Sequence, residues 1–139
     1  MKLAVKILLN LLVLLSIPMM LIGGLAIAKI VSPLIVISGS MEPEIGVGSL
    51  IVATNVKAKD LHVGDVASFK RDDGVLVTHR IISNEALAGN GELRTVRMKG
   101  DANKDADQDP YIQSDALKPL FVVPAVGSAL SAVGNHKFE

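Results

Sequence analysis

The pattern of apolar and polar residues divides the chain into one long uncharged segment and a series of short aliphatic runs after it. Residues 7–28, between Lys6 and Lys29, contain no charged side chain. At a rise of ~1.5 Å per residue, a helix over this segment spans the ~30 Å hydrocarbon core of a bilayer. The segment has no polar face, which argues against a helix of a soluble core. We therefore expect residues 1–31 to form an N-terminal transmembrane anchor.

The charges around this segment predict its orientation. Lys2 and Lys6 lie on the short leading side. The positive-inside tendency then puts the N-terminus in the cytoplasm, and the chain from about residue 30 outside the membrane or in a lumen. Residues 26–28 have the Ala-x-Ala form of a cleavage site, so a removable signal peptide is the alternative. The apolar region exceeds the usual ~7–15 residues of such a peptide, which favours a retained anchor.

Beyond Pro33 the pattern changes to short runs rich in Val, Ile and Thr, several of which alternate in polarity. Such runs, bounded by Gly, Asp and Asn, are typical of strands. They cover residues 34–38, 49–54, 65–70, 75–83 and 92–99. Asp73-Gly74 lies between two of them and predicts a hairpin turn. We expect a mainly β fold, a small antiparallel β domain over residues 32–139. Residues 120–133 are expected to add a final strand and a short amphipathic or membrane-touching element.

Composition narrows the function classes. The chain has 14 basic and 14 acidic residues and a formal net charge of +0, whereas a nucleic-acid-binding protein usually has a strongly basic face. It has no cysteine, which excludes disulfides, thiolate chemistry and Cys-ligated zinc. We expect no nucleic-acid partner, no cofactor and no metal.

A candidate nucleophile follows the apolar segment closely. Residues 38–43 read Ser-Gly-Ser-Met-Glu-Pro, directly after an aliphatic run. A glycine-containing turn after a strand can project the hydroxyl of Ser40 and leave backbone N–H groups free to hold an oxyanion. A reactive serine here would work close to the lipid surface.

A serine hydroxyl needs an adjacent base to attack an amide. His79, in the run Val-Thr-His-Arg-Ile, is a candidate because a neutral imidazole suits general-base work near pH 7. His62 and His136 match no motif. Lys70 and Lys99 are the backups should the base be a lysine.

These segments, with Lys-Gly-Asp-Ala-Asn at residues 99–103, resemble the conserved boxes of type I signal peptidases in their order along the chain. The resemblance implies that Ser40 is the nucleophile and that the Ser38 hydroxyl helps the Ser40 backbone N–H to form an oxyanion hole. Many bacterial members carry a lysine where this chain has His79. The His-Arg pair resembles the branch found in the eukaryotic ER, archaea and some spore-forming bacteria.

The resemblance also implies a catalytic aspartate in the loop after residue 100. In the ER-type branch it follows six residues after the first Asp of the third box, which selects Asp107. Asp109, before Pro110, is an alternative that needs a two-residue insertion. Asp101 is a second alternative, although it is better suited to building the loop through backbone hydrogen bonds. The acid would accept a hydrogen bond from His79 and fix its orientation.

The same loop also matches the start of a calcium-binding pattern at residues 101–105. That pattern needs Gly at its sixth position and Glu at its twelfth, where this chain has Ala106 and Ile112. Calcium binding is therefore disfavoured.

The resemblance implies a membrane-bound serine endopeptidase that removes signal peptides from secreted precursors, cutting after Ala-x-Ala-type residues through an acyl-enzyme. Its partners would be signal peptides and membrane lipid, with any accessory subunits unknown. The substrate would add as a strand to a sheet edge. Ile37, Pro43 and Ile45 are candidate pocket residues. One alternative is a catalytically silent, membrane-anchored β module that binds secreted proteins or calcium. Another is a self-cleaving regulator, whose DNA-binding module is missing here.

Overall fold

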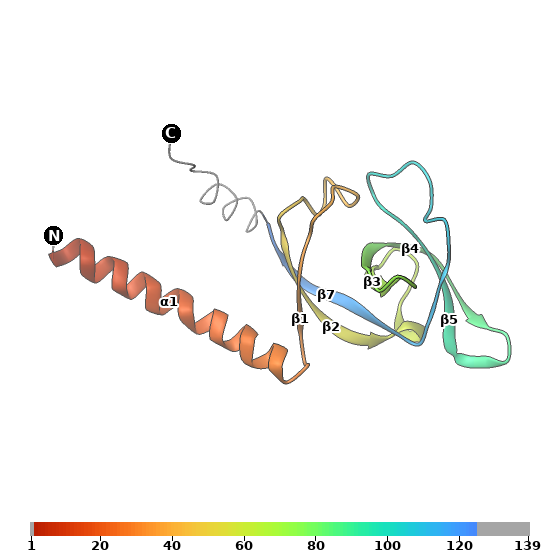
Figure 1. Cartoon of the computed structure of the whole chain (residues 1–139), viewed down its shortest axis with the longest axis horizontal. Helices are drawn as coiled ribbons and strands as arrows, with labels where there is room; N and C mark the ends of the chain where they lie inside the picture. Colours follow the sequence, from red (N-terminus) through yellow and green to blue (C-terminus); the bar gives the residue numbers. More distant parts are fainter. Residues whose placement is uncertain (1, 125–139) are drawn as a thin grey trace. The chain divides into compact units, whose positions relative to one another are not determined.

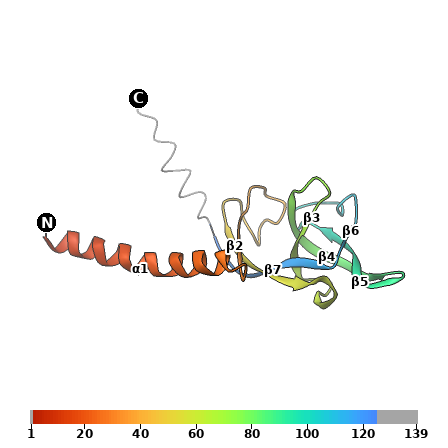
Figure 2. The same cartoon turned by 60° about the horizontal axis from the view of Figure 1, so that its bottom comes forward.

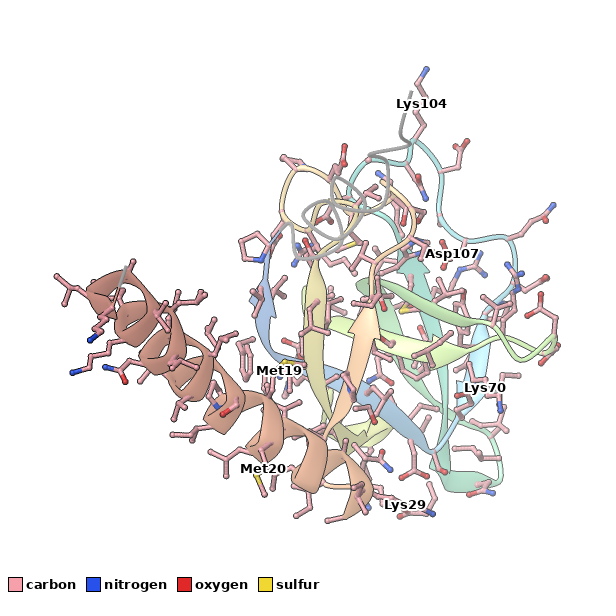
Figure 3. All side chains as sticks on the ribbon, turned by 60° about the vertical axis from the view of Figure 1, so that its left-hand side comes forward. Met19, Met20, Lys29, Lys70, Lys104 and Asp107 are labelled. Carbon is pink, nitrogen blue, oxygen red and sulfur yellow. The ribbon has the colours of Figure 1, made fainter. Side chains whose placement is uncertain are left out.

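The computed structural model describes residues 2–124. The chain divides into two compact units, one up to Val31 and one from Ser32 onward, and each is described by itself. The first unit is the helix α1 (Lys2–Ile27), drawn in red and orange in Figure 1. None of its residues is buried, and Met19 and Met20, labelled in Figure 3, are 77% and 81% exposed. By length and composition this helix is able to cross a membrane, as the uncharged run predicts.

The second unit contains one antiparallel sheet. Its strands are β1 (Ser32–Ile35), β2 (Leu50–Lys57), β3 (Val66–Lys70), β4 (Leu76–Leu87), β5 (Asn90–Lys99), β6 (Tyr111–Gln113) and β7 (Asp115–Val123). A short 3-10 helix, η1 (Ala58–Asp60), follows β2. The strand order is β1-β2-β7-β3-β4-β5-β6, and every pair is antiparallel. The prediction of a mainly β, antiparallel fold after an apolar helix is confirmed.

The sheet curls on itself, as Figures 1 and 2 show. Three strands separate β1 from β4 in the sheet order, yet residues of both line one cleft. Curling brings together segments that a flat sheet would hold far apart, and it follows from the twist of adjacent strands.

The observed strands differ from the expected ones most clearly at three places. The strand expected over residues 34–38 is observed as β1, which begins at Ser32 and ends at Ile35, so residues 36–38 are not part of a strand. The three-residue strand β6, which lies directly after an Asp-Pro pair, is not predicted by the sequence pattern. Strand β7 begins at Asp115, five residues before the expected start at Leu120. Asp115 is paired across the sheet with Lys57, at 2.8 Å, so its charge is tolerated in a strand. Pro119 lies where the β2–β7 register shifts, the kind of position at which a sheet accepts proline. Residues 125–133 of the expected final element lie outside the described residues.

Two apolar clusters support the parts of the sheet that carry the candidate site. The smaller contains Met41, Ile45, Ile51 and Ala53, and so fixes the turn after β1 against β2. The larger includes Phe69 of β3, Ile81 of β4 and Met98 of β5. The predicted Asp73-Gly74 hairpin joins β3 to β4, with Gly74 at φ 86°, a value that glycine adopts readily.

Candidate active site

Ser40 lies in a turn that is anchored by the buried side chains of its neighbours. The turn follows β1, and the Glu42 N–H donates to the Gly39 carbonyl oxygen over 3.1 Å. Met41 and Ile45, on either side of the cis Glu42–Pro43 bond, are 2% and 4% exposed. Ser40 itself stays half-buried, so its hydroxyl is held by a rigid turn and remains accessible.

His79 comes from the middle of the sheet. It lies on β4 opposite Ala67 of β3, and its side chain is 11% exposed. The His79 Nε2 atom is 3.0 Å from the Ser40 Oγ. The sheet therefore fixes the imidazole at hydrogen-bond distance from a hydroxyl 39 residues away in the sequence.

Asp107 reaches the other side of the imidazole from the loop between β5 and β6, where Figure 3 labels it. Its carboxylate oxygens lie 2.7 and 2.8 Å from the His79 Nδ1. The Asp107 N–H donates to the Met98 carbonyl oxygen over 2.9 Å, which ties the loop to the end of β5. A carboxylate only accepts, so it keeps the proton of neutral His79 on Nδ1 and leaves Nε2 to accept from Ser40.

Tyr111 is a further residue of the site, and it was not among the candidates predicted from the sequence. Its hydroxyl donates to Asp107 Oδ2 over 3.0 Å, and it is 7% exposed. Burial, and after it the hydrogen bond to Asp107, raise the pKa of the Tyr111 phenol. A signal was present in the sequence: this is the one tyrosine of the chain, it follows the acidic loop, and a buried tyrosine needs a partner for its hydroxyl.

Two donor groups lie close to the Ser40 hydroxyl. The Ser38 Oγ is 3.2 Å from the Ser40 Oγ. Within residues 2–124 the backbone N–H of Ser40 has no hydrogen-bond acceptor. Ser38 and this N–H are the donors that the family resemblance selects, and their position makes a role in binding an oxyanion geometrically feasible.

Gly100 allows the acidic loop to approach the Ser40 turn backbone to backbone. The Ala102 N–H donates to the Ser40 carbonyl oxygen over 2.9 Å. A Cβ on residue 100 would lie 2.6 Å from that same oxygen and 2.7 Å from the Asn103 Nδ2. This contact joins the segment that carries the serine to the loop that carries Asp107.

Arg80, next to His79, joins three segments around the site. Its guanidinium donates to both carboxylate oxygens of Asp101, at 2.8 and 2.7 Å, and to the Gly64 carbonyl oxygen at 2.8 Å. It also donates to Glu44 in the turn that follows Ser40. The hydrogen bonds from Arg80 hold the pKa of the Asp101 carboxyl below its usual range. Asp101 thus has a structural partner and makes no hydrogen bond to His79.

The remaining candidates lie elsewhere. Asp109 is exposed, and no hydrogen bond of its carboxylate occurs among the described residues. His62 is 84% exposed at its side chain, and His136 lies outside the described residues. Neither Lys70 nor Lys99 is hydrogen-bonded to Ser40 in the part of the chain that the structure describes. Asp101 is engaged by Arg80, and residues 2–124 contain no cluster of three acidic or histidine side chains suited to a metal.

Ser40 and His79 are among the residues that line an apolar cleft of about 400 Å³. Residues of β1 and of the start of β4 line it, together with Ile37 and Ile45, two of the three expected pocket residues. Pro43 is not among the lining residues, because the turn directs Met41 and Ile45 inward instead and leaves Pro43 exposed. A second cleft, of about 350 Å³, is also bounded by His79 and Asp107 and has a more polar lining.

Comparison with known proteins finds relatives over much of the chain. The chain is 42% identical to signal peptidase I W of Bacillus subtilis over 76 residues, which is 54% of this chain and 38% of that protein. It is 30% identical over 119 residues to the signal peptidase complex catalytic subunit of Schizophyllum commune, covering 74% of this chain and 62% of the relative. It is 30% identical over 132 residues to the corresponding subunit of Fusarium vanettenii, covering 91% and 75%. No family model matches the chain.

Proposed function

Because the chain belongs to the type I signal peptidase family, in its ER-type branch, we propose that it is a membrane-bound serine endopeptidase that removes signal peptides from secreted precursors. One observation carries this proposal beyond family membership. Asp107, His79 and Ser40 form an unbroken series of hydrogen-bond contacts, and Ser40 and His79 line an apolar cleft. This is the arrangement that activates a serine hydroxyl for acyl transfer.

In the proposed mechanism, His79 acts first as a base and then as an acid. Nε2 takes the Ser40 proton as Oγ attacks the carbonyl carbon of the scissile bond. The Ser40 N–H and the Ser38 hydroxyl donate to the resulting oxyanion. The imidazolium then gives its proton to the leaving amine, which becomes the N-terminus of the mature protein. The signal peptide remains as an ester on Ser40, and His79 activates a water that hydrolyses this ester.

Asp107 supports both steps by accepting from His79 Nδ1. This bond holds the ring in the tautomer that has a free Nε2, and the carboxylate stabilises the imidazolium that forms during attack. The low exposure of both side chains, 11% and 12%, strengthens the interaction because little water competes for it.

The cleft supports the proposed specificity for small residues before the cut. It is lined mainly by aliphatic side chains and is bounded by β1, a strand at one end of the sheet order. A precursor segment in extended form is able to pair with such an edge, where main-chain hydrogen bonds give affinity and alternate side chains give selectivity. Ile37 and Ile45 are placed to contact the substrate side chains.

The anchor and its orientation belong to the same proposal. Residues 1–31 would hold the protein in the membrane with the N-terminus in the cytoplasm. Residues 32–139 would form the catalytic domain on the outer or lumenal side, where precursors emerge. Signal peptides and lipid would then meet at one place.

The test is cleavage of a precursor with an Ala-x-Ala site by the full chain in liposomes. Ser40→Ala and His79→Ala should each abolish cleavage while circular dichroism remains that of the wild type. His62→Ala is the matched control, because its exposed ring makes no contact with Ser40, and should cleave like the wild type. Cleavage by Ser40→Ala would show the nucleophile to be wrong. Absence of cleavage by the wild type would favour a silent module.

A further inference from the structure

We propose that Tyr111 is a positioning residue, which holds the Asp107 carboxylate in the orientation that pairs with His79. The inference rests on the proposed function, since it assigns a role within the same site.

Near Asp107, the loop that carries this residue is fixed at few points. Between Lys99 and Tyr111 the chain forms turns and bends without a helix or strand. Near Asp107 its attachment to the sheet consists of the backbone bond to Met98 and the contacts of the carboxylate itself. Figure 3 shows Lys104 of the same loop pointing away from the sheet. The direction of the carboxylate therefore depends strongly on its own partners.

His79 alone does not define that direction. Its Nδ1 lies 2.7 Å from one oxygen of Asp107 and 2.8 Å from the other. A single N–H that is shared almost evenly between two oxygens permits the carboxylate to rotate about its axis. Tyr111 donates to Oδ2 alone, at 3.0 Å, and this second bond distinguishes the two oxygens.

Tyr111 is itself rigidly placed. It lies on β6 opposite Val96 of β5 and belongs to the larger apolar cluster. Its ring packs against that of Phe69, with centroids 5.7 Å apart and an interplanar angle of 37°. The hydroxyl is thus a fixed donor from the core of the sheet to a carboxylate on a loop. The raised pKa of the phenol agrees with this role, because the group stays protonated across the pH range in which a peptidase with a histidine base works.

The deciding variant is Tyr111→Phe in the full chain, which keeps the ring against Phe69 and removes only the hydroxyl. We expect the kcat for precursor cleavage to fall roughly tenfold with KM unchanged, the size expected for one hydrogen bond to a charged group. The low-pH limb of kcat/KM should move to higher pH, because a carboxylate without its donor attracts the imidazolium proton more strongly. The other charged groups near His79 are not altered by this substitution; they are Asp101 and, along the polar cleft, Lys70, Arg71, Asp72 and Asp109.

Two comparisons separate positioning from a general loss of stability. Ser68→Ala removes a buried hydroxyl that is hydrogen-bonded to Thr78 and not to Asp107 or His79, so it should leave kcat and the pH profile unchanged. Tyr111→Phe should have no further effect in an Asp107→Asn background, since Tyr111 acts through that carboxylate. An equal loss in both backgrounds, or wild-type kcat and pH profile in Tyr111→Phe, would overturn the proposal.

The proposal and the proposed function fail in different ways. If the wild type cleaves no precursor, the proposed substrate is wrong, and the same variants are compared by the rate at which a fluorophosphonate probe labels Ser40. That rate depends on the His79–Asp107 pair and on no peptide. Slower labelling in Tyr111→Phe, cancelled in the Asp107→Asn background, would support the positioning role. Unchanged labelling, or none in the wild type, would refute it.

Discussion

Gly100→Ala tests whether the close approach of two backbones positions the nucleophile. The added methyl group would lie 2.6 Å from the Ser40 carbonyl oxygen, a distance that real Cβ atoms essentially never show. The second neighbour, the Asn103 side chain at 2.7 Å, is able to rotate away. The carbonyl oxygen is backbone and cannot do so, and one of the two backbones, the Ser40 turn or the loop that carries Asp107, therefore has to move.

The size of the movement follows from the contact distances. The two backbones must separate by about 0.8 Å to reach ordinary contact at 3.4 Å. Either movement lengthens the 2.9 Å hydrogen bond from the Ala102 N–H to the Ser40 carbonyl oxygen. It also displaces the Ser40 Oγ or the Asp107 carboxylate relative to His79. A displacement of about 1 Å at a reacting group costs ~10²-fold in rate. Overpacking of a tight site costs about 1–3 kcal/mol of stability.

The assay measures kcat/KM on an Ala-x-Ala precursor together with urea unfolding of the same full-length protein. We expect a ~10²-fold loss of kcat/KM and a free energy of unfolding lower by about 1–3 kcal/mol. Gly46→Ala and Gly91→Ala are matched controls, because a Cβ at either position meets no atom within 4 Å. Gly46 is the sharper control, since it lies a few residues after Ser40. A Gly100→Ala protein with activity within twofold of wild type would refute the reasoning.

Two further predictions concern the acidic residues of the site. Asp107→Asn should lower kcat by ~10³–10⁴-fold, because an amide oriented toward Nδ1 favours the wrong tautomer of His79, whereas the matched Asp109→Asn should keep kcat within about twofold of the wild type. Steady-state kinetics at pH 7 distinguishes the two variants, and equal losses would contradict the assignment of Asp107. Arg80 holds the pKa of the Asp101 carboxyl below its usual range. The pair therefore stabilises the folded state fully at a pH above the unfolded-state pKa of ~3.9, and this stabilisation is lost as the pH falls through the lower pKa of the folded state. Melting temperatures measured between neutral and acidic pH should therefore fall less steeply for Asp101→Asn than for the wild type, and parallel curves would disprove the role of the pair.

Local pattern was sufficient for the broad architecture. An uncharged run predicts a helix by its length alone, and short Val- and Ile-rich runs between turn residues predict strands, since both signals depend on neighbouring residues. The pattern was insufficient for β6, because three residues after an Asp-Pro pair contain no period, and Tyr111 joins the sheet only by pairing with Val96. The expectation that Pro43 lines the cleft was wrong, because proximity to Ser40 in the sequence does not determine which side chains of a turn face the cleft.

By itself the sequence determined the anchor-like helix, the β class, and the three segments that resemble the boxes of a signal peptidase. It named Ser40 and His79 but left three aspartates of one loop as candidates for the acid. Only the tertiary structure showed that Asp107 is hydrogen-bonded to His79, that Asp101 is paired with Arg80, and that the Tyr111 hydroxyl donates to the Asp107 carboxylate. The physical reason is that an irregular loop has no periodicity to read. Its path depends on contacts with residues distant in sequence, such as the approach of Gly100 to the Ser40 carbonyl oxygen, which exist only once the sheet has curled.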